Sequence, residues 1–253
     1  MDLIRAFIFL CFVILIDGEC ITSQLSAPRS ALTATSVGNM VLFAGGYNDT
    51  QGFSLVDIFD TSSNSWTSYA LETRKGAMTS TSIVDVAFFN GGTVLDMYNS
   101  TSKTWSTTSL SVRRYYEGVA SSGTHAIWAG GYTETIASNA VDIFTYSGVG
   151  AGTWETATLS VARRGIAATA VGSYFLFAGG LASSTVTTVD IYNTATNEWS
   201  VDNLPTPRYT LNGDFYAISA GDVAFFTGSN KEVVDMFNPT TSVWSTVCLT
   251  AYK

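Results

Sequence analysis

The chain has 253 residues, 13% of them charged, and a formal net charge of −8 at pH 7. This length suits one large domain or two small ones. An acidic chain is a poor ligand for nucleic acid unless its cations are gathered in one place, so we expect no nucleic-acid partner.

The first predicted element is a secretory signal peptide over residues 1–20. An arginine in MDLIR is followed by eleven consecutive apolar residues, 6–16, and then by the small and polar DGEC. The apolar run is shorter than the about 20 residues that span a bilayer, and no later segment is long enough. A buried strand or an uncleaved anchor is the alternative. We therefore expect a secreted or lumenal protein, and the sequons at Asn48 and Asn99 predict a glycoprotein.

A short apolar strand that ends in two glycines then recurs along the chain. MVLFAGGY begins at Met40, AIWAGGY follows at 126–132 and FLFAGGL at 175–181. Partial copies are VAFFNGG at 86–92 and VAFFTGS at 223–229. Each copy predicts a strand buried on both faces, followed by a turn or a close backbone approach that requires glycine.

Two further signatures have the same period, and together the three mark five units. The second is an aspartate between apolar residues followed by a tryptophan, and the third is an arginine that opens the unit. The aspartates are Asp57, Asp96, Asp142, Asp190 and Asp235; the tryptophans are Trp66, Trp105, Trp154, Trp199 and Trp244; the arginines are Arg29, Arg74, Arg113, Arg163 and Arg208.

Each unit is predicted to contain four strands, which in the first unit are residues 31–37, 40–44, 55–60 and 65–69. Helical periodicity is not convincing anywhere after the signal peptide. Four-stranded, all-β units of 39 to 49 residues are typical of propeller blades, because stacked blades cover each other's apolar faces. We expect one propeller over residues 25–248, with blades at about 25–70, 71–109, 110–158, 159–203 and 204–248.

This combination of arginine, apolar run, Gly-Gly pair and spaced tryptophan resembles the kelch repeat, over about Leu25 to Cys248. The resemblance implies a β-propeller in which the first strand of each blade lines a central channel. Kelch propellers commonly have six or seven blades, and this chain has five units. The five blades either close alone or form an incomplete ring, completed to six by a terminal edge strand at Ile21–Leu25 or by a partner; monomer and homo-oligomer both stay open.

The two ends of the repeat array each carry a cysteine. If the ring closes, a Cys20–Cys248 disulfide could join its ends and contribute up to about 5 kcal/mol in the chain-entropy model. The alternative, which we favour slightly, is that the signal is cleaved after Cys20 and leaves Cys248 unpaired.

A binding site is predicted where the units open, because most of the lysines and arginines lie there. Arginine offers a planar fork for carboxylate, sulfate or phosphate, and tyrosine offers an aromatic face and a hydroxyl. The first arginine of each opening matches the repeat and is expected to be structural. We expect the extra cations and nearby tyrosines to bind an acidic glycan or an acidic loop of a protein. These residues are Lys75, Arg114, Arg164, Tyr115, Tyr116 and Tyr209.

Catalysis is not expected, and neither a metal nor a cofactor is predicted. The resemblance extends to copper radical oxidases similar to galactose oxidase, whose chemistry needs several metal ligands, whereas His125 is the sole histidine. The five repeated aspartates are expected to be structural. Glu117 in RRYYEG is expected to be a surface ion-pair partner. The rival hypothesis makes it the general base of a carbohydrate-active enzyme, such as an epimerase or a hydrolase.

Overall fold

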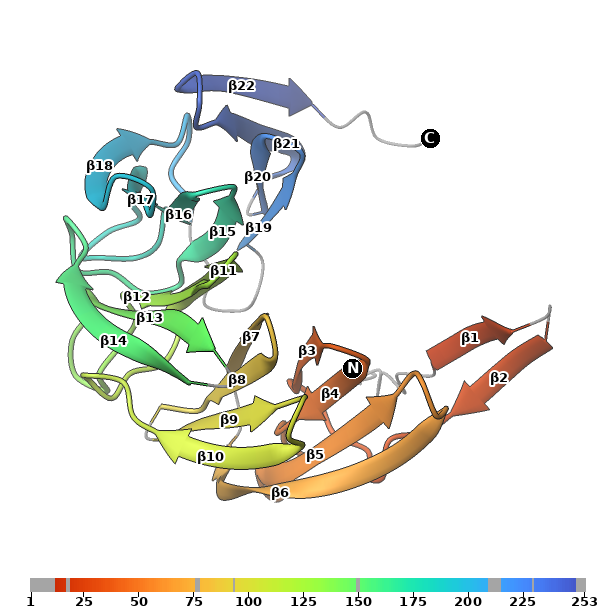
Figure 1. The fold of residues 1–253 in the computed structure, drawn as a ribbon. Helices are drawn as coiled ribbons and strands as arrows, with labels where there is room; N and C mark the ends of the chain where they lie inside the picture. Colours follow the sequence, from red (N-terminus) through yellow and green to blue (C-terminus); the bar gives the residue numbers. More distant parts are fainter. Residues whose placement is uncertain are drawn as a thin grey trace, which may run out of the picture.

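The computed structural model describes residues 12–16, 19–75, 78–92, 94–148, 151–208, 215–228 and 230–248, with side chains from residue 23 onward except 73–75, 230 and 231. The described residues form 22 strands in one two-stranded sheet and five four-stranded sheets (Figure 1). They include no helix long and apolar enough to cross a membrane. The predicted all-β propeller with five four-stranded blades is confirmed.

Each blade is an antiparallel meander whose strands follow chain order. Blade 1 contains β3 (Thr33–Val37), β4 (Met40–Ala44), β5 (Phe53–Asp60) and β6 (Ser65–Lys75); blade 2 contains β7 (Thr79–Ile83), β8 (Val86–Asn90), β9 (Leu95–Asn99) and β10 (Thr104–Thr108); blade 3 contains β11 (Gly118–Ser122), β12 (His125–Ala129), β13 (Ala140–Gly148) and β14 (Ala151–Thr158); blade 4 contains β15 (Ala167–Val171), β16 (Tyr174–Ala178), β17 (Thr188–Asn193) and β18 (Glu198–Asn203); blade 5 contains β19 (Phe215–Ala220), β20 (Val223–Gly228), β21 (Asn230–Asn238) and β22 (Val243–Cys248).

The blades stand side by side around an axis, with their first strands innermost and β6, β10, β14, β18 and β22 outermost (Figure 1). Neighbouring inner strands contact each other from β3 through β7, β11 and β15 to β19, but β3 and β19 make no comparable contact. The ring is therefore open between blade 5 and blade 1 in the described part of the chain.

The N-terminal strands do not complete this ring. β1 (Phe12–Ile16) and β2 (Glu19–Ser23) pair with each other as an isolated hairpin. The alternative in which Ile21–Leu25 adds an edge strand to the last blade is wrong, because the backbone bonds of β2 are made to β1 instead. At the other end, Cys248 is a free and exposed thiol, and the side chain of Cys20 lies outside the described residues.

The core consists of four apolar layers, one between each pair of neighbouring blades. We call the face of a blade that turns toward the next blade in chain order its forward face. On the forward face of blade 4, for example, Leu176 and Val189 are fully buried against Phe226 and Phe237 of blade 5. Because both faces of the second strand are covered, it reads as a continuous apolar run.

The recurring glycines are explained by the approach of the next opening loop. Gly130 and Gly131 follow β12 with φ of +67° and +112°, a region that favours glycine. A Cβ atom on Gly130 would lie 2.4 Å from Ile166 Cδ1, and one on Gly131 would lie 2.8 Å from the carbonyl oxygen of Tyr115. The Gly-Gly pair therefore lets the chain turn directly under the loops that open two successive blades.

Candidate functional site

Four of the opening loops are held to their blades by a buried arginine. In blade 4 the guanidinium of Arg163 donates hydrogen bonds to the carbonyl oxygens of Val161 at 3.0 Å, Phe177 at 2.9 Å and Gly179 at 2.8 Å. Its Nη2 atom also lies 2.7 Å from Asp190 Oδ2. Burial lowers the pKa of Arg163, and Asp190 opposes that shift. The guanidinium thus joins the loop to the second and third strands of its own blade.

The same ion pair recurs around the propeller with both side chains almost fully buried. The pairs are Arg29–Asp57 at 2.8 Å, Arg114–Asp142 at 2.6 Å, Arg163–Asp190 at 2.7 Å and Arg208–Asp235 at 2.7 Å. This repetition shows that these aspartates are structural, as the sequence predicts, and that their arginine partners belong to the scaffold.

In blade 3 the scaffold arginine is Arg114 and not Arg113. Arg114 is fully buried and donates to the carbonyl oxygen of Trp128, whereas the side chain of Arg113 is 52% exposed. The sequence-based prediction made Arg113 the structural arginine and Arg114 a ligand-binding residue. The expectation for Arg114 is wrong. The repeat spacing carries the signal, since 17 residues separate both Arg114 from Gly131 and Arg29 from Gly46.

Arg113, which is exposed, and Arg164, which is half-buried, lie beside tyrosine rings at the openings of blades 3 and 4. Arg113 Nη2 donates to the hydroxyl of Tyr115 at 2.6 Å and lies 2.9 Å from Glu134 Oε1. The contact with Tyr115 and the charge of Glu134 raise the pKa of Arg113. The guanidinium of Arg164 stacks over the ring of Tyr132 at 4.2 Å.

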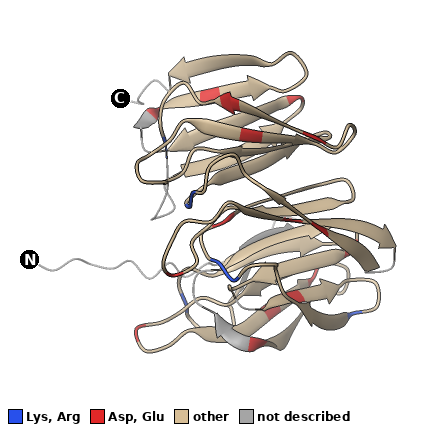
Figure 2. Ribbon diagram, turned by 90° about the vertical axis from the view of Figure 1, so that its left-hand side faces the viewer, with Lys and Arg blue, Asp and Glu red and all other residues tan. Residues whose placement is uncertain are grey.

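Backbone pairing makes these residues one surface. Tyr115 and Tyr132 exchange two backbone hydrogen bonds, of 3.0 and 2.8 Å, and therefore lie side by side. We call the set Arg113, Tyr115, Tyr116, Tyr132 and Arg164 the mouth cluster. Figure 2 shows that lysine and arginine positions lie mainly toward one end of the strands, whereas aspartates and glutamates are spread over the blades.

Tyr116 has an unusual backbone conformation. It is 47% exposed and has a φ of +57°, in the left-handed region. The equivalent residues share this conformation, Ala31 in blade 1 with a φ of +50° and Gly165 in blade 4 with a φ of +64°. The left-handed turn is therefore a feature of the repeat, and what distinguishes blade 3 is that a bulky residue adopts it, at a cost of order 1–3 kcal/mol.

Of the predicted ligand residues, Tyr115, Tyr116 and Arg164 come together in this cluster. The side chain of Lys75 and the whole of Tyr209 lie outside the described residues. Their ligand-binding role, like that of the cluster as a whole, stays a prediction. Tyr132 was not among the predicted ligand residues, although its position directly after a Gly-Gly pair can be recognised from the repeat.

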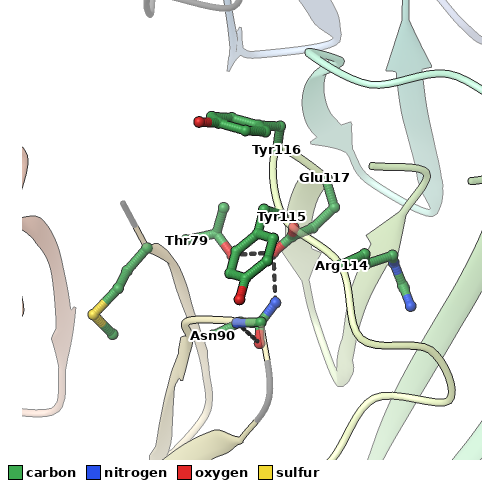
Figure 3. Close-up of a pocket in the computed structure, with 8 residues that line it drawn as sticks. Thr79, Asn90, Arg114, Tyr115, Tyr116 and Glu117 are labelled. Atoms are coloured by element: carbon green, nitrogen blue, oxygen red, sulfur yellow. Dashed lines mark hydrogen bonds between the residues drawn. The ribbon is translucent and has the colours of Figure 1, made fainter. Parts of the chain in front are cut away.

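Glu117 is buried, so the expectation of a surface ion pair is wrong. It is 6% exposed and lies between blades 2 and 3 (Figure 3). Its Oε1 atom accepts hydrogen bonds from Thr79 Oγ1 at 2.6 Å and from Asn90 Nδ2 at 2.7 Å. Its Oε2 atom is buried without a hydrogen-bond partner.

A small pocket lies beside this carboxylate. Its volume is about 70 Å³, and its lining includes Met78, Tyr115, Tyr116 and the Thr79–Asn90–Glu117 group. The side chain of Arg114 points away from Glu117, toward Asp142 (Figure 3). Asn90 was not predicted as a site residue, although it stands where three other units have an alanine directly before Gly-Gly.

Metal ligation finds no support among the described residues, which contain no group of three or more histidine, cysteine, aspartate or glutamate side chains placed to hold an ion. His125 lies at the start of β12, where its ring packs edge-on against Phe175 at 6.4 Å. Burial lowers the pKa of His125. These contacts are those of an ordinary side chain packed between two blades.

Comparison with known proteins agrees with the fold. Residues 28–70, which make up blade 1 and its opening loop, match the family model of the Kelch motif. A solved structure titled "Structure of YjhT" superposes with a TM-score of 0.65 and 13% identity, over 90% of this chain and 88% of that chain. No curated protein matches the sequence. The architecture is that of a kelch-type β-propeller.

Proposed function

We propose that this kelch-type propeller is a secreted, non-catalytic binding module whose mouth cluster takes an acidic group of a protein or a glycan. The observation that carries the proposal is the division of the described arginine side chains. Arg29, Arg114, Arg163 and Arg208 are buried in scaffold ion pairs. The two others, Arg113 and Arg164, both lie at the mouth, each against a tyrosine ring.

The chemistry of the cluster suits a carboxylate or sulfate. Arg164 is held by stacking on Tyr132, and no described residue accepts a hydrogen bond from its guanidinium, so its donors are available to a ligand. Arg113 already contacts Glu134, and an acidic ligand would replace that exposed partner, whose attraction is weak in water. Stacked arginines lose little side-chain entropy on binding, which favours recognition of planar anions.

The proposal of secretion rests on the sequence of residues 1–20. The proposal of a protein-binding role rests on the propeller fold. An extracellular location also suits a ligand that is a sulfated glycan, a glycan containing uronic acid, or an acidic loop of a protein. Expression of the full chain in cells, followed by mass spectrometry of the protein in the medium, tests secretion and the cleavage site together.

Binding is tested on arrays of acidic and neutral glycans and of acidic peptides, at low and physiological salt. Wild type is compared with Arg113→Ala/Arg164→Ala, and with Lys103→Ala, which removes an exposed cation in the β9–β10 turn. We expect salt-sensitive binding to acidic probes that falls at least tenfold in the double variant and is unchanged in Lys103→Ala. Equal binding by wild type and the double variant would rule out the mouth cluster.

A second function is favoured by the burial of Glu117 with one free oxygen. In this alternative the propeller is a carbohydrate-active enzyme in which Glu117 takes a proton from the substrate. Turnover of sialic-acid and uronic-acid substrates that disappears in Glu117→Gln would establish it, whereas absence of turnover by wild type leaves the binding role.

A further inference from the structure

Two polar residues interrupt the apolar repeat at one point between blades 2 and 3. The position of Glu117, three residues after the scaffold arginine, is Leu32 in blade 1 and Ile166 in blade 4. The position of Asn90, directly before glycine, is alanine in blades 1, 3 and 4. The two exceptions touch, since Asn90 Nδ2 donates to Glu117 Oε1. Local rules of a fold are most often broken at functional sites.

The arrangement leaves one carboxylate oxygen without a partner in the interior. Oε1 of Glu117 is saturated by Thr79 and Asn90, and Oε2 is buried without a hydrogen bond. No described lysine or arginine pairs with this carboxylate. A buried charge without a partner is strongly unfavourable, so the site gains most from a ligand that supplies both a positive charge and one donor.

We propose that the pocket beside Glu117 binds one primary ammonium group, the end of a lysine side chain of a protein partner. The pocket, at about 70 Å³, is far smaller than the roughly 300–1,000 Å³ of pockets that enclose drug-sized ligands. It can therefore admit the end of an extended side chain such as lysine, but not a whole sugar. The ring of Tyr115 lies beside Glu117 (Figure 3), and aromatic rings attract such a cation. Arg114 also belongs to the lining, but its guanidinium is paired with Asp142.

The geometry disfavours other cations. A guanidinium binds carboxylate best through two parallel hydrogen bonds, and Glu117 offers only Oε2. Calcium takes about six to eight oxygen ligands, and this pocket supplies one carboxylate. An ammonium is a compact donor that needs a single strong acceptor, so it matches the one unpaired oxygen, Oε2 of Glu117.

A lysine ammonium at Glu117 is a second recognition feature, in addition to the acidic group of the proposed function. A partner loop that carries an acidic residue for Arg113 or Arg164 and a lysine for Glu117 would use both charges of the mouth. A probe with an ammonium and no acidic group tests the pocket alone, so failure here and failure of the mouth cluster are distinguishable.

The probe is N-acetyl-lysine methylamide, titrated into the isotope-labelled full chain while the backbone amide resonances of Thr79, Gly92 and Glu117 are followed. Analogues with an acetylated ammonium and with a terminal hydroxyl are run in parallel. We expect saturable shifts at these amides with the lysine probe, and at least tenfold weaker binding by both analogues. Equal affinity for the hydroxyl analogue, or the absence of shifts, would overturn the proposal.

Two variants separate binding from scaffold. Glu117→Gln keeps the Oε1 acceptor for Thr79 and Asn90 and should lower the affinity for the lysine probe at least tenfold. Glu134→Gln, at an exposed carboxylate of the same mouth, should leave that affinity unchanged. Asn90→Ala/Glu117→Leu restores the residues of blade 1, so it should melt at a higher temperature than wild type and not bind. Unchanged probe affinity in either variant at Glu117 would contradict the assignment.

Discussion

At the scale of single residues, the propeller contains side chains that its repeat does not require. Tyr116 occupies a left-handed backbone position that blade 4 fills with Gly165. His125 begins β12, where the equivalent residues are Met40 in blade 1 and Tyr174 in blade 4. Since the repeat supplies a reference residue for each exception, its energetic effect can be measured by restoring that reference.

Replacing Tyr116 by glycine should stabilise the fold and weaken ligand binding. A left-handed conformation costs a non-glycine residue about 1–2 kcal/mol, and the greater freedom of glycine in the unfolded chain offsets about half of the gain. We expect an increase of up to about 1 kcal/mol in the free energy of unfolding, measured in urea. A loss of stability would mean that the exposed ring packs on the protein rather than serving a ligand.

His125 should titrate below the ordinary histidine pKa of about 6.5. Burial lowers the pKa of His125, and the charge of Glu155 opposes that effect. The unfolded chain then binds the proton at a higher pH than the folded protein, so stability falls as the pH drops through about 6.5. Proton NMR follows this residue without ambiguity because the chain has one histidine. A midpoint at or above 6.5 would contradict the structure, and His125→Gln should flatten the dependence.

At the scale of the strands, the three sequence signatures correspond to three physical tasks. Gly130 and Gly131 permit a left-handed turn beneath the next loop, Asp190 holds Arg163, and Trp199 stacks on Tyr192 with ring centroids 4.9 Å apart. Because the aspartate and the tryptophan recur in all five units and the Gly-Gly pair in four, the strand order and the core positions were predictable from the sequence alone.

Other features were not predictable, because they depend on how neighbouring loops meet. A pair of adjacent arginines does not show which one is buried, although the 17-residue spacing to glycine identifies Arg114. The burial of Glu117 depends on Asn90 of the preceding blade, which is 27 residues away. The pairing of β2 with β1 could not be predicted from residues 21–25, because β1 lies within the apolar run that was assigned to the signal peptide.

Breaking a scaffold ion pair should be the most damaging single change at this scale. Asp190→Asn removes the charge that faces Arg163 and leaves the guanidinium buried and uncompensated. Loss of one partner of a buried pair costs about 3–5 kcal/mol. Urea unfolding followed by tryptophan fluorescence checks this value. Lys103→Ala, at the exposed pair with Asp60, is the control and should change stability by less than about 1 kcal/mol.

At the scale of the whole molecule, the open ring leaves the forward face of blade 5 without a neighbouring blade in the described part of the chain. The forward face of blade 5 carries Ile218 and Phe225, which are paired across β19 and β20, with Met236 beside them on β21. Ile218 is 67% exposed, whereas its equivalent in blade 4, Thr169, is 8% exposed. Tyr216, Val243 and Val247 extend the same exposed face. Apolar faces of this kind favour association.

Two substitutions at matched places in the repeat should therefore have opposite consequences. Leu176→Ala on the covered forward face of blade 4 opens a cavity and should cost about 2–5 kcal/mol. Ile218→Thr, on the uncovered face of blade 5, restores the residue of blade 4 and should change stability by about 0.5 kcal/mol or less, since its side chain is exposed. It should also reduce any concentration-dependent association seen by sedimentation velocity. A large loss of stability in Ile218→Thr would show that the face is covered in solution, either by closure of the ring or by a second chain. Sedimentation of that variant at several concentrations distinguishes the two, because closure within one chain does not depend on concentration.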